Sequence, residues 1–416
     1  MNSDSWLECI NCHTKYDARK IIYVCEKCGH LLDVNYSDLD KALEGDWKSK
    51  TISVWKYSPF LPKLKHVISL NEGKTNLYHC VNLSDKMGID NIWVKNEGEN
   101  PTGSFKDRGM TVGVSVAKSL GSGIVACAST GNTSASLAAY AAKAKITCVV
   151  FIPSGKIALG KLAQAMMYGA FVLAIKGNFD EALELVQESC DRFHMYLLNS
   201  LNPYRLEGQK TIGYEIVEQL NWNVPDTIIL PVGNAGNISA IYKGLLEWKK
   251  IGLIDKIPRM IGIQAEGSAP IANTYKKGEK EVTFVEKPET VATAIRIGKP
   301  VNWEKALRAI YGSPRGMAET VSDEEILEAQ KTLARTEGIF VEPASASSIA
   351  GLKKLVDSGE IERDERVVCV TTGHGLKDPD TAIKSCEETI QVEADIREIE
   401  KVLSKITRKA INAYAV

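Results

Sequence analysis

A lysine stands where a helix is predicted to begin. The segment NPTGSFKDRG (residues 100–109) places a proline and glycine turn directly before an apolar, helix-forming run. Ser104 is a typical N-cap residue, and Asp107 three residues later gives an acidic variant of the capping box. Lys106 in that first turn opposes the positive end of the helix dipole, so its amine should lose a proton easily. A neutral lysine amine is a nucleophile that forms a Schiff base with an aldehyde.

A second stretch, ASTGNTSAS (residues 128–136), follows the apolar run GIVACA and opens the next predicted helix. Free N–H groups at a helix N-terminus favour an anion, and the small polar side chains here add donors to them. Simple N-capping is the alternative interpretation, although it needs only one such residue. The polar side chains that we expect at a ligand are Ser129, Thr130, Asn132 and Thr133.

PVGNAGNIS (residues 231–239) also joins a predicted strand to a predicted helix. Its glycines, Gly233 and Gly236, let the backbone approach a ligand closely, which is typical of a phosphate cradle. The spacing is neither G-x-G-x-x-G nor a Walker loop, and an ordinary tight turn is the alternative.

The third glycine turn is TTGHG (residues 371–375), at the end of another predicted strand. Thr372 offers a neutral hydrogen-bond partner, whereas a lone histidine is usually structural, so we expect no chemical role for His374. The lysine, the phosphate cradle and the neutral hydroxyl together fit pyridoxal phosphate (PLP), which has an aldehyde, a phosphate and a ring nitrogen.

Four of the ten cysteines form two CxxC pairs with twelve residues between the pairs. Cys9, Cys12, Cys25 and Cys28 have the spacing of a four-cysteine zinc ribbon, in which four thiolates close on one structural ion. Coincidental pairs, or a redox pair, are the alternatives. The ribbon is not set in a basic, aromatic surface, so we expect no nucleic acid there.

Predicted strands and helices alternate along the chain, and the polar turns described above follow strands. Near-continuous apolar strands between amphipathic helices predict an α/β protein with two open, mostly parallel sheets flanked by helices. Ligands bind beyond the carboxyl ends of the strands of such sheets, where the polar turns stand. The predicted strands are 91–95, 123–128, 147–152, 170–175, 226–232, 259–265 and 366–372. The predicted helices are 105–119, 133–144, 159–169, 180–193, 238–250, 323–336 and 346–359, with a helix-prone tail beyond about 387.

We expect three parts in the 416-residue chain: a ribbon module (1–45), a large PLP-binding domain (46–115 and 205–416) and a small α/β domain (116–204). The formal net charge of -1 gives no indication of nucleic-acid or membrane binding. No signal peptide and no 18-residue apolar stretch is visible, so a cytoplasmic protein is expected.

From about residue 50 to 385 the sequence resembles threonine synthase, a PLP enzyme of the tryptophan-synthase-β fold group (fold type II). The resemblance implies that Lys106 carries the cofactor and that Asn132 lies against its 3′-oxygen. It implies that Thr372 faces the ring nitrogen. The implied loop for the cofactor phosphate is Gly233, Asn234, Ala235, Gly236 and Asn237.

LNSLNPYRLEGQKT (residues 198–211) is similar to the segment that holds the substrate phosphate in threonine synthases. Asn199, Ser200 and Arg205 are the implied ligands, and an arginine offers a planar fork to a phosphate. An arginine on a solvated loop is the alternative. A further segment, IPSGKIALGKLAQ, also resembles the family and brings Ser154 and Lys156 into consideration.

The implied reaction converts O-phospho-L-homoserine and water to L-threonine and phosphate through a PLP Schiff base, and the family suggests a homodimer. Another fold type II enzyme, such as threonine dehydratase or cysteate synthase, is the nearest alternative. The phosphate segment argues against the dehydratase, whose substrate has no phosphate. A nicotinamide enzyme lacks support because the G-x-G-x-x-G fingerprint is absent. A zinc-ribbon binding protein with an inactive enzyme-like body is the third alternative.

Overall fold

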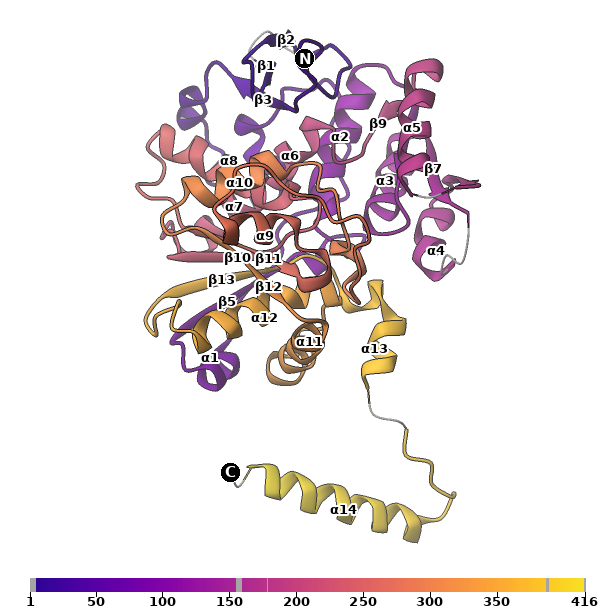
Figure 1. Ribbon diagram of the computed structural model, residues 1–416, viewed down its shortest axis with the longest axis vertical. Helices are drawn as coiled ribbons and strands as arrows, with labels where there is room; N and C mark the ends of the chain where they lie inside the picture. The colour runs from indigo at the N-terminus through magenta and orange to yellow at the C-terminus, as the bar shows by residue number, and fades with distance from the viewer. Residues whose placement is uncertain (1–4, 155–158, 178, 387–388, 415–416) are drawn as a thin grey trace. The chain divides into compact units, whose positions relative to one another are not determined.

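The computed structural model describes the chain except for residues 1–4, 155–158, 178, 387–388 and 415–416 (Figure 1). Its contacts divide the chain into two compact units, Met1–Pro379 and Asp380–Val416. The first unit holds three sheets and every residue of the candidate site.

The largest sheet has six strands in the order β12-β11-β10-β13-β5-β4. All neighbours are parallel except β4, which pairs antiparallel with β5 at one edge. The two edge strands, β4 and β12, are short and were not predicted, because neither has a long apolar run. The strands are β4 (Leu77–His79), β5 (Asn91–Asn96), β10 (Thr227–Pro231), β11 (Arg259–Ala265), β12 (Met317–Val321) and β13 (Arg366–Thr371).

A second sheet has four parallel strands in the order β8-β7-β6-β9. The two sheets confirm the expected fold class. The strands are β6 (Ile124–Ala128), β7 (Thr147–Pro153), β8 (Phe171–Ile175) and β9 (Tyr196–Leu197). The helices between Lys106 and Phe193 are α2 (Lys106–Ser119), α3 (Asn132–Ala144), α4 (Leu159–Met167) and α5 (Phe179–Phe193).

The remaining helices of the first unit lie mostly around the six-stranded sheet. Helix α12 is rich in alanine and serine, and its small side chains bring it close to the strands. A Cβ atom on Gly351 would overlap the side chain of Ile263 in β11. These helices are α1 (Val81–Met87), α6 (Pro203–Gln209), α7 (Thr211–Gln219), α8 (Gly236–Lys250), α9 (Pro270–Lys277), α10 (Trp303–Gly312), α11 (Asp323–Glu337) and α12 (Pro343–Asp357).

Short 3-10 helices complete the connections. They are η1 (Asp40–Glu44), η2 (Val54–Phe60), η3 (Glu97–Glu99), η4 (Glu266–Ser268), η5 (Thr293–Ile295) and η6 (Gly375–Lys377).

An antiparallel sheet in the order β2-β1-β3 forms the N-terminal module. Its strands, drawn in indigo in Figure 1, are β1 (Ser5–Cys9), β2 (Lys15–Asp17) and β3 (Leu32–Tyr36). Cys9 is the last residue of β1, Cys12 lies in the turn after it, and Cys25 and Cys28 lie in the loop between β2 and β3.

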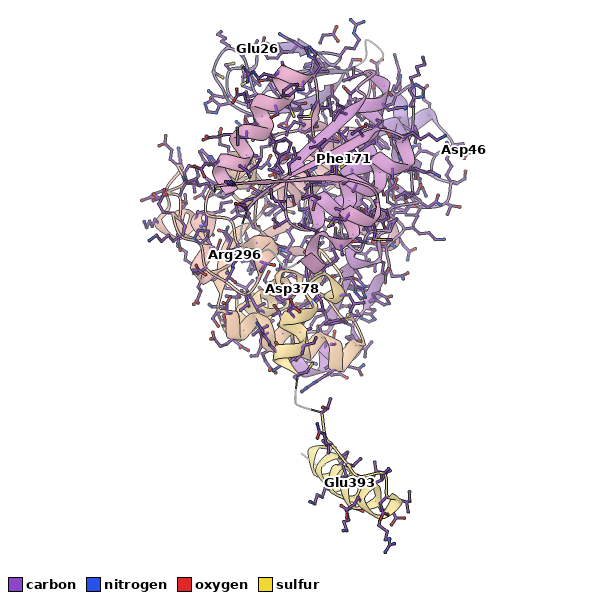
Figure 2. All side chains as sticks on the ribbon, turned by 90° about the vertical axis from the view of Figure 1, so that its right-hand side faces the viewer. Glu26, Asp46, Phe171, Arg296, Asp378 and Glu393 are labelled. Carbon is purple, nitrogen blue, oxygen red and sulfur yellow. The ribbon has the colours of Figure 1, made fainter. Side chains whose placement is uncertain are left out.

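The second unit contains α14 (Ile396–Tyr414), and α13 (Pro379–Ser385) crosses the boundary between the units. Figure 2 labels Glu393 in this unit and Asp378 at the end of the first. Among the helices of the described chain, none has the length and apolar character needed to cross a bilayer.

Candidate active site

The lysine turn lies at the carboxyl end of β5 and runs into α2, which begins at Lys106. Ser104 is not the N-cap, so the expected capping box is wrong. Phe105 occupies that position without a side-chain cap, and the hydroxyl of Ser104 is buried without a partner. The carboxylate of Asp107 is bound elsewhere: it accepts from the N–H and hydroxyl of Thr102 (both 2.7 Å) and from the hydroxyl of Ser136 (2.5 Å).

Lys106 Nζ lies 3.8 Å from the centre of the Phe105 ring, and no hydrogen bond joins it to another described residue. Burial and the nearby guanidinium of Arg205 lower the pKa of Lys106 to about 7, although Glu342 acts in the opposite direction. The expected direction of the pKa shift is confirmed. Its main cause is the loss of solvent rather than the helix dipole.

An ion-pair network holds α2 behind the lysine. Arg108 is fully buried and pairs with Glu97 (Nε–Oε2, 2.6 Å) and Glu215 (Nη1–Oε1, 2.7 Å). Lys95 also pairs with Glu215, at 2.8 Å. Burial alone would raise the pKa of Glu215, but Arg108 and Lys95 lower it to about 2. Because every charge in this cluster is paired, α2 has a fixed position beside the site.

The TTGHG turn lies directly beside the lysine turn. The N–H of Phe105 donates to the carbonyl of Thr372 (3.0 Å), and the N–H of His374 donates to the carbonyl of Gly103 (2.9 Å). The hydroxyl of Ser345 in α12 contacts Thr372 and Gly373. The structure therefore places the TTGHG turn directly beside the lysine turn.

The loop after β6 carries Ser129, Thr130, Asn132 and Thr133, all partly exposed at the start of α3. Asn132 donates from Nδ2 to both carboxylate oxygens of Glu342, at 3.0 and 3.1 Å. Asn199 binds the backbone of Ala128 on both sides, through Oδ1 (2.8 Å) and Nδ2 (3.2 Å). Asn199 therefore fixes the end of β6, which is a bracing role that the sequence did not indicate.

GNAGN joins β10 to α8 in a conformation that suits an anion. Ala235 has a positive φ of 63° at the helix N-cap and makes no side-chain cap. Asn237 is 5% exposed, and neither Nδ2 nor Oδ1 of its carboxamide has a partner. A Cβ atom on Gly233 would lie 3.1 Å from the Cα of Ile295, so only glycine fits there without strain. The N–H of Asn302, the N-cap residue of α10, donates to the carbonyl of Asn234 at 3.1 Å.

Arg205 is the second basic side chain of the site, and unlike the partly buried Lys106 it is buried. It lies in α6 with 3% exposure, so the alternative of a solvated loop is wrong. Its Nε is buried without a partner, and its guanidinium makes no ion pair within the described chain. Burial lowers the pKa of Arg205 to about 10. A buried guanidinium without an ion-pair partner is costly, so this position is suited to an anion.

Helix α6 reaches the site because glycines remove side chains between α2 and α6. A Cβ atom on Gly109 would lie 3.0 Å from the carbonyl oxygen of Arg205 and 3.3 Å from its Cβ. A Cβ atom on Gly208 would overlap the carbonyl of Arg108. The two backbones touch, and this contact sets Arg205 beside the lysine helix.

Other predicted residues are less closely tied to this centre. Ser200 accepts through its carbonyl from Asn302 Nδ2 at 3.1 Å. Ser154 is exposed directly after β7, and among the described residues only its N–H makes a hydrogen bond, to the carbonyl of Ile175. Lys156 lies outside the described residues.

The residues fit the groups of PLP. Buried polar atoms without partners gather on the segments around Lys106, which is the pattern expected where a polar ligand supplies the missing bonds. These atoms belong to Ser104, Arg205, Gln209 and Asn237. Lys106 has the amine for the aldehyde, and the N-terminus of α8 has the free N–H groups for the phosphate.

The sequence missed the first turn of α12. Helix α12 begins at Pro343 rather than near residue 346, and Glu342 and Ser345 there contact Asn132 and Thr372. Proline at the first helical position is a usable signal for this earlier start. Gln209 was also missed; a Cβ atom on Gly236 would lie 3.5 Å from its unpaired Oε1.

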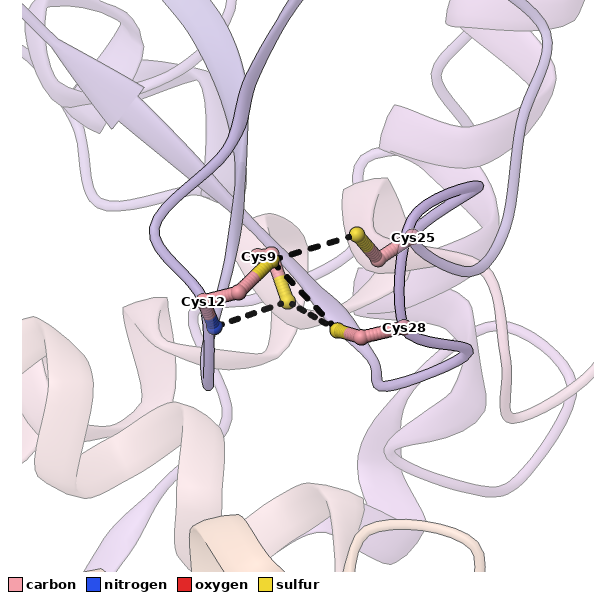
Figure 3. Close-up of side chains that lie close together, drawn as sticks. All are labelled: Cys9, Cys12, Cys25 and Cys28. Carbon is pink, nitrogen blue, oxygen red and sulfur yellow. Dashed lines mark hydrogen bonds between the residues drawn. The ribbon is translucent and has the colours of Figure 1, made fainter.

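The four ribbon cysteines form a compact cluster (Figure 3). Their sulfurs lie within 4.8 Å of one another, with Cys9–Cys28 and Cys12–Cys28 at 3.4 Å and Cys12–Cys25 at 3.5 Å. Tetrahedral zinc with four thiolates separates the sulfurs by about 3.8 Å, so the cluster can hold one zinc with small adjustments. His30 binds Glu304 instead of the cluster, at 3.0 Å.

Comparison with known proteins gives the class. The sequence profile of the family described as "Pyridoxal-phosphate dependent enzyme" matches residues 68–373. Threonine deaminase isoform 2 from Solanum lycopersicum superposes with a TM-score of 0.63 and 21% identity, covering 75% of this chain and 86% of that one. Diaminopropionate ammonia lyase from Escherichia coli superposes with a TM-score of 0.65 and 14% identity. The match covers 78% of this chain and 94% of that one. At these identities the structures establish the fold, which is that of PLP enzymes of fold type II.

Sequence relatives are more specific. Threonine synthase from Methanocaldococcus jannaschii is 58% identical over 403 residues, covering 96% of this chain and 99% of that protein. Threonine synthase from Mycobacterium tuberculosis is 54% identical over 329 residues, which cover 79% of this chain and 88% of that protein. The chain belongs to the threonine synthase family of PLP-dependent enzymes.

Proposed function

We propose that the protein converts O-phospho-L-homoserine and water to L-threonine and phosphate. The observation that carries this proposal is the buried, unpaired guanidinium of Arg205. The cofactor phosphate has a different site, because the N-terminus of α8 offers it backbone N–H groups and Asn237. A second anion site beside Lys106 therefore indicates a substrate that carries its own phosphate.

Each part of the site has a role in this reaction. Bound PLP supplies an electron sink for the substrate carbons. Lys106 holds the cofactor through its amine and moves protons at the substrate, for which a pKa near 7 is well suited. Asn132 would hold the 3′-oxygen of the cofactor, and Thr372 would hold its ring nitrogen. The residues that we assign to the substrate are Ser129, Thr130, Thr133, Ser154, Asn199, Ser200 and Arg205.

Arg205 should also raise the rate of turnover, and not only the affinity for the substrate. The substrate phosphate is the leaving group, so negative charge grows on it as the bond breaks. A guanidinium at that position binds the transition state more tightly than the ground state. A dehydratase substrate, which lacks a phosphate, would leave Arg205 buried and unpaired.

The wider assignments rest on the same family and remain our proposals. We assign the protein to the cytoplasm, as a homodimer acting on a small molecule without nucleic-acid or membrane partners. Its domains are the module 1–45, the large domain 46–115 with 205–416, and the small domain 116–204. Cys9, Cys12, Cys25 and Cys28 hold a structural zinc.

The direct test is substrate choice. Purified PLP-loaded protein is mixed with O-phosphohomoserine and, separately, with O-phosphoserine, while released phosphate and the amino acid formed are measured. We expect equal amounts of phosphate and threonine from the first substrate. Efficient release from O-phosphoserine alone would instead place the protein with enzymes such as cysteate synthase.

Arg205→Ala tests the phosphate site. Loss of a charge-assisted contact should cost about 2–4 kcal/mol, or about 30- to 1000-fold in kcat/KM, with part of the loss in kcat. Arg205→Lys keeps the charge without the planar fork and should recover only part of the activity. The absorbance band of the bound cofactor serves as the control. Normal kinetics in Arg205→Ala would exclude this site, and loss of the band would assign Arg205 to the cofactor.

A further inference from the structure

The four-stranded sheet ends at β8, which pairs with β7 on one side and with no strand of the described chain on the other. Helices α3 and α5 pack over β6 and β7. On β8 the side chain of Phe171, which is labelled in Figure 2, is 65% exposed, and that of Leu173 is 44% exposed. Both the backbone edge and the apolar side chains of this strand are therefore open.

The other edge strands of the two parallel sheets are protected against pairing with another chain. Strands β4 and β9 have only three and two residues. Strand β12 carries Glu319, which pairs with Lys276 at 2.5 Å. The five residues of β8, FVLAI, include no charge and no proline. An apolar edge without these devices is a template on which another strand can pair.

The hydrogen bonding to β7 shows which backbone groups of β8 are unused. The carbonyl of Ile175 accepts from the N–H of Ser154, directly after β7. In a strand, the N–H and C=O of one residue point to the same side, and those of the next residue point to the opposite side. Phe171, Leu173 and Ile175 therefore direct these groups to β7, whereas Val172 and Ala174 direct theirs to the open edge.

These two residues make the edge complementary to itself. When two copies of β8 run antiparallel with Leu173 at the centre, Val172 of each copy lies opposite Ala174 of the other, and every N–H and C=O of these residues is paired. Leu173 then lies opposite Leu173 of the second copy, and Phe171 lies opposite its Ile175. The side chains of these three positions share one face, so the pairing also joins two apolar stripes.

We propose that the open edge of β8 is an interaction surface for a second copy of this chain, which adds its own β8 antiparallel with Leu173 at the two-fold axis. A two-fold pairing uses the same surface on both copies and therefore closes on itself. An uncharged strand has no polar group that would select a foreign peptide. The exposed side chains of Met166 and Met167, at the end of α4, enlarge the apolar surface next to β8.

This inference names the surface for the homodimer assigned above, and it does not depend on the reaction. Disulfide formation in PLP-loaded protein tests its register. In Leu173→Cys the two thiols would lie opposite each other, with Cα atoms about 4.5 Å apart, which a disulfide can span. We expect oxidation to link two copies on a non-reducing gel. A Cys386→Ser background removes the exposed cysteine outside the ribbon module.

Phe171→Cys is the matched control for the register. It lies on the same face of β8 and is more exposed than Leu173, but its counterpart would lie about 13 Å away along the strand, so no link should form. The double variant Phe171→Cys, Ile175→Cys should link, because each cysteine faces the other type. Equal linking of Leu173→Cys and Phe171→Cys, or no linking of Leu173→Cys, would overturn the proposal.

Leu173→Lys tests the surface without a disulfide. Two lysines would lie opposite each other and repel, so the dissociation constant of the pair should rise at least about tenfold. Light scattering at a fixed low concentration should give half the wild-type molar mass. Leu246→Lys, at a residue of α8 that is 41% exposed, should keep the wild-type mass. An unchanged mass in Leu173→Lys, or a wild type that is a single chain, would refute the pairing.

Hydrogen exchange identifies what covers the edge. The amides of Val172 and Ala174 should exchange at least about tenfold faster in Leu173→Lys than in the wild type, since they lose their acceptors. Protection of these amides in a single chain would mean that another segment covers β8, contrary to the proposal. Threonine formation is measured on the same samples. An active single chain would contradict only the pairing of β8, whereas a paired protein that forms no threonine would contradict only the proposed reaction.

Discussion

Two basic side chains, the partly buried Lys106 and the buried Arg205, belong to the candidate site, and neither has a carboxylate paired with it in the described structure. Burial and Arg205 both favour the neutral form of Lys106, while Arg205 stays charged with its pKa lowered to about 10. Glu342 offsets part of this effect, and its own pKa is raised by burial. Lys106 is therefore nucleophilic near neutral pH. Arg205 remains charged and can bind an anion.

The reactivity of Lys106 should therefore rise with pH around a midpoint near 7 in the cofactor-free protein. Above that pH the amine is neutral and reacts with PLP; below it the amine is protonated and does not. The rate of appearance of the covalent cofactor band, measured across pH, gives the midpoint, and borohydride reduction with peptide mapping identifies the lysine.

Arg205→Gln should move that midpoint upward, because it removes a positive charge near the amine. Arg363→Gln, at an exposed arginine paired with Asp90, should leave it unchanged. A midpoint above 9 in the wild type, or an adduct on another lysine, would contradict the interpretation of Lys106.

Among the secondary-structure elements, the contact between α2 and α6 determines the site. Glycines at the crossing remove the side chains that would hold the helices apart, so Arg205 comes to lie over α2. The paired charges of Arg108, Glu97 and Glu215 then fix α2 from its other side.

Gly208→Ala should destabilise the protein by at least about 1–3 kcal/mol, because the added methyl group overlaps the carbonyl of Arg108. It should also lower kcat/KM on O-phosphohomoserine, since α6 must shift with Arg205. Denaturant unfolding and steady-state kinetics measure the two effects. Gly123→Ala is the control: a Cβ atom there meets nothing within 4 Å, so both quantities should stay near wild type. Equal stability of the two variants would refute the close-packing argument.

At the scale of the whole molecule, the cysteine module is attached to the same helices that carry the site. Lys305 in α10 binds the carbonyl of Leu32 (2.8 Å) and the carboxylate of Asp33 (2.6 Å). Tyr204 in α6 donates to the carbonyl of Ala18 at 2.5 Å. The module therefore braces α6 and α10 from outside, and none of its cysteines is among the site residues.

Metal analysis should find about one zinc per chain, and the double variant Cys25→Ser, Cys28→Ser should lose it. Chelation should lower the thermal midpoint of unfolding more than it lowers activity at moderate temperature, because the ion closes the module and takes no part in the chemistry. Cys386→Ser, at an exposed cysteine outside the cluster, should keep both zinc and stability. Lost catalysis with an unchanged midpoint would contradict a structural role.

The sequence by itself determined the parallel α/β class, most element positions and the segments that meet at the site. Apolar runs with the right periodicity are local, and the carboxyl ends of parallel strands necessarily gather at one edge of a sheet. GNAGN and the cysteine pairs are also local, because their spacing in the sequence brings their residues close together. The short strands β4, β9 and β12 were missed, since they depend on pairing with distant strands.

Only the tertiary structure decided how individual polar atoms are used. Ser104 has the residue type and spacing of an N-cap, but Phe105 takes that position, and Thr102 and Ser136 hold Asp107. Arg205 could have lain in solvent, and its burial follows from a contact between helices about 100 positions apart in the sequence. Ser345 lies 27 residues from Thr372, yet its hydroxyl accepts from the N–H groups of Thr372 and Gly373. The sequence could not show this contact, because the neighbours of a buried atom come from the whole chain.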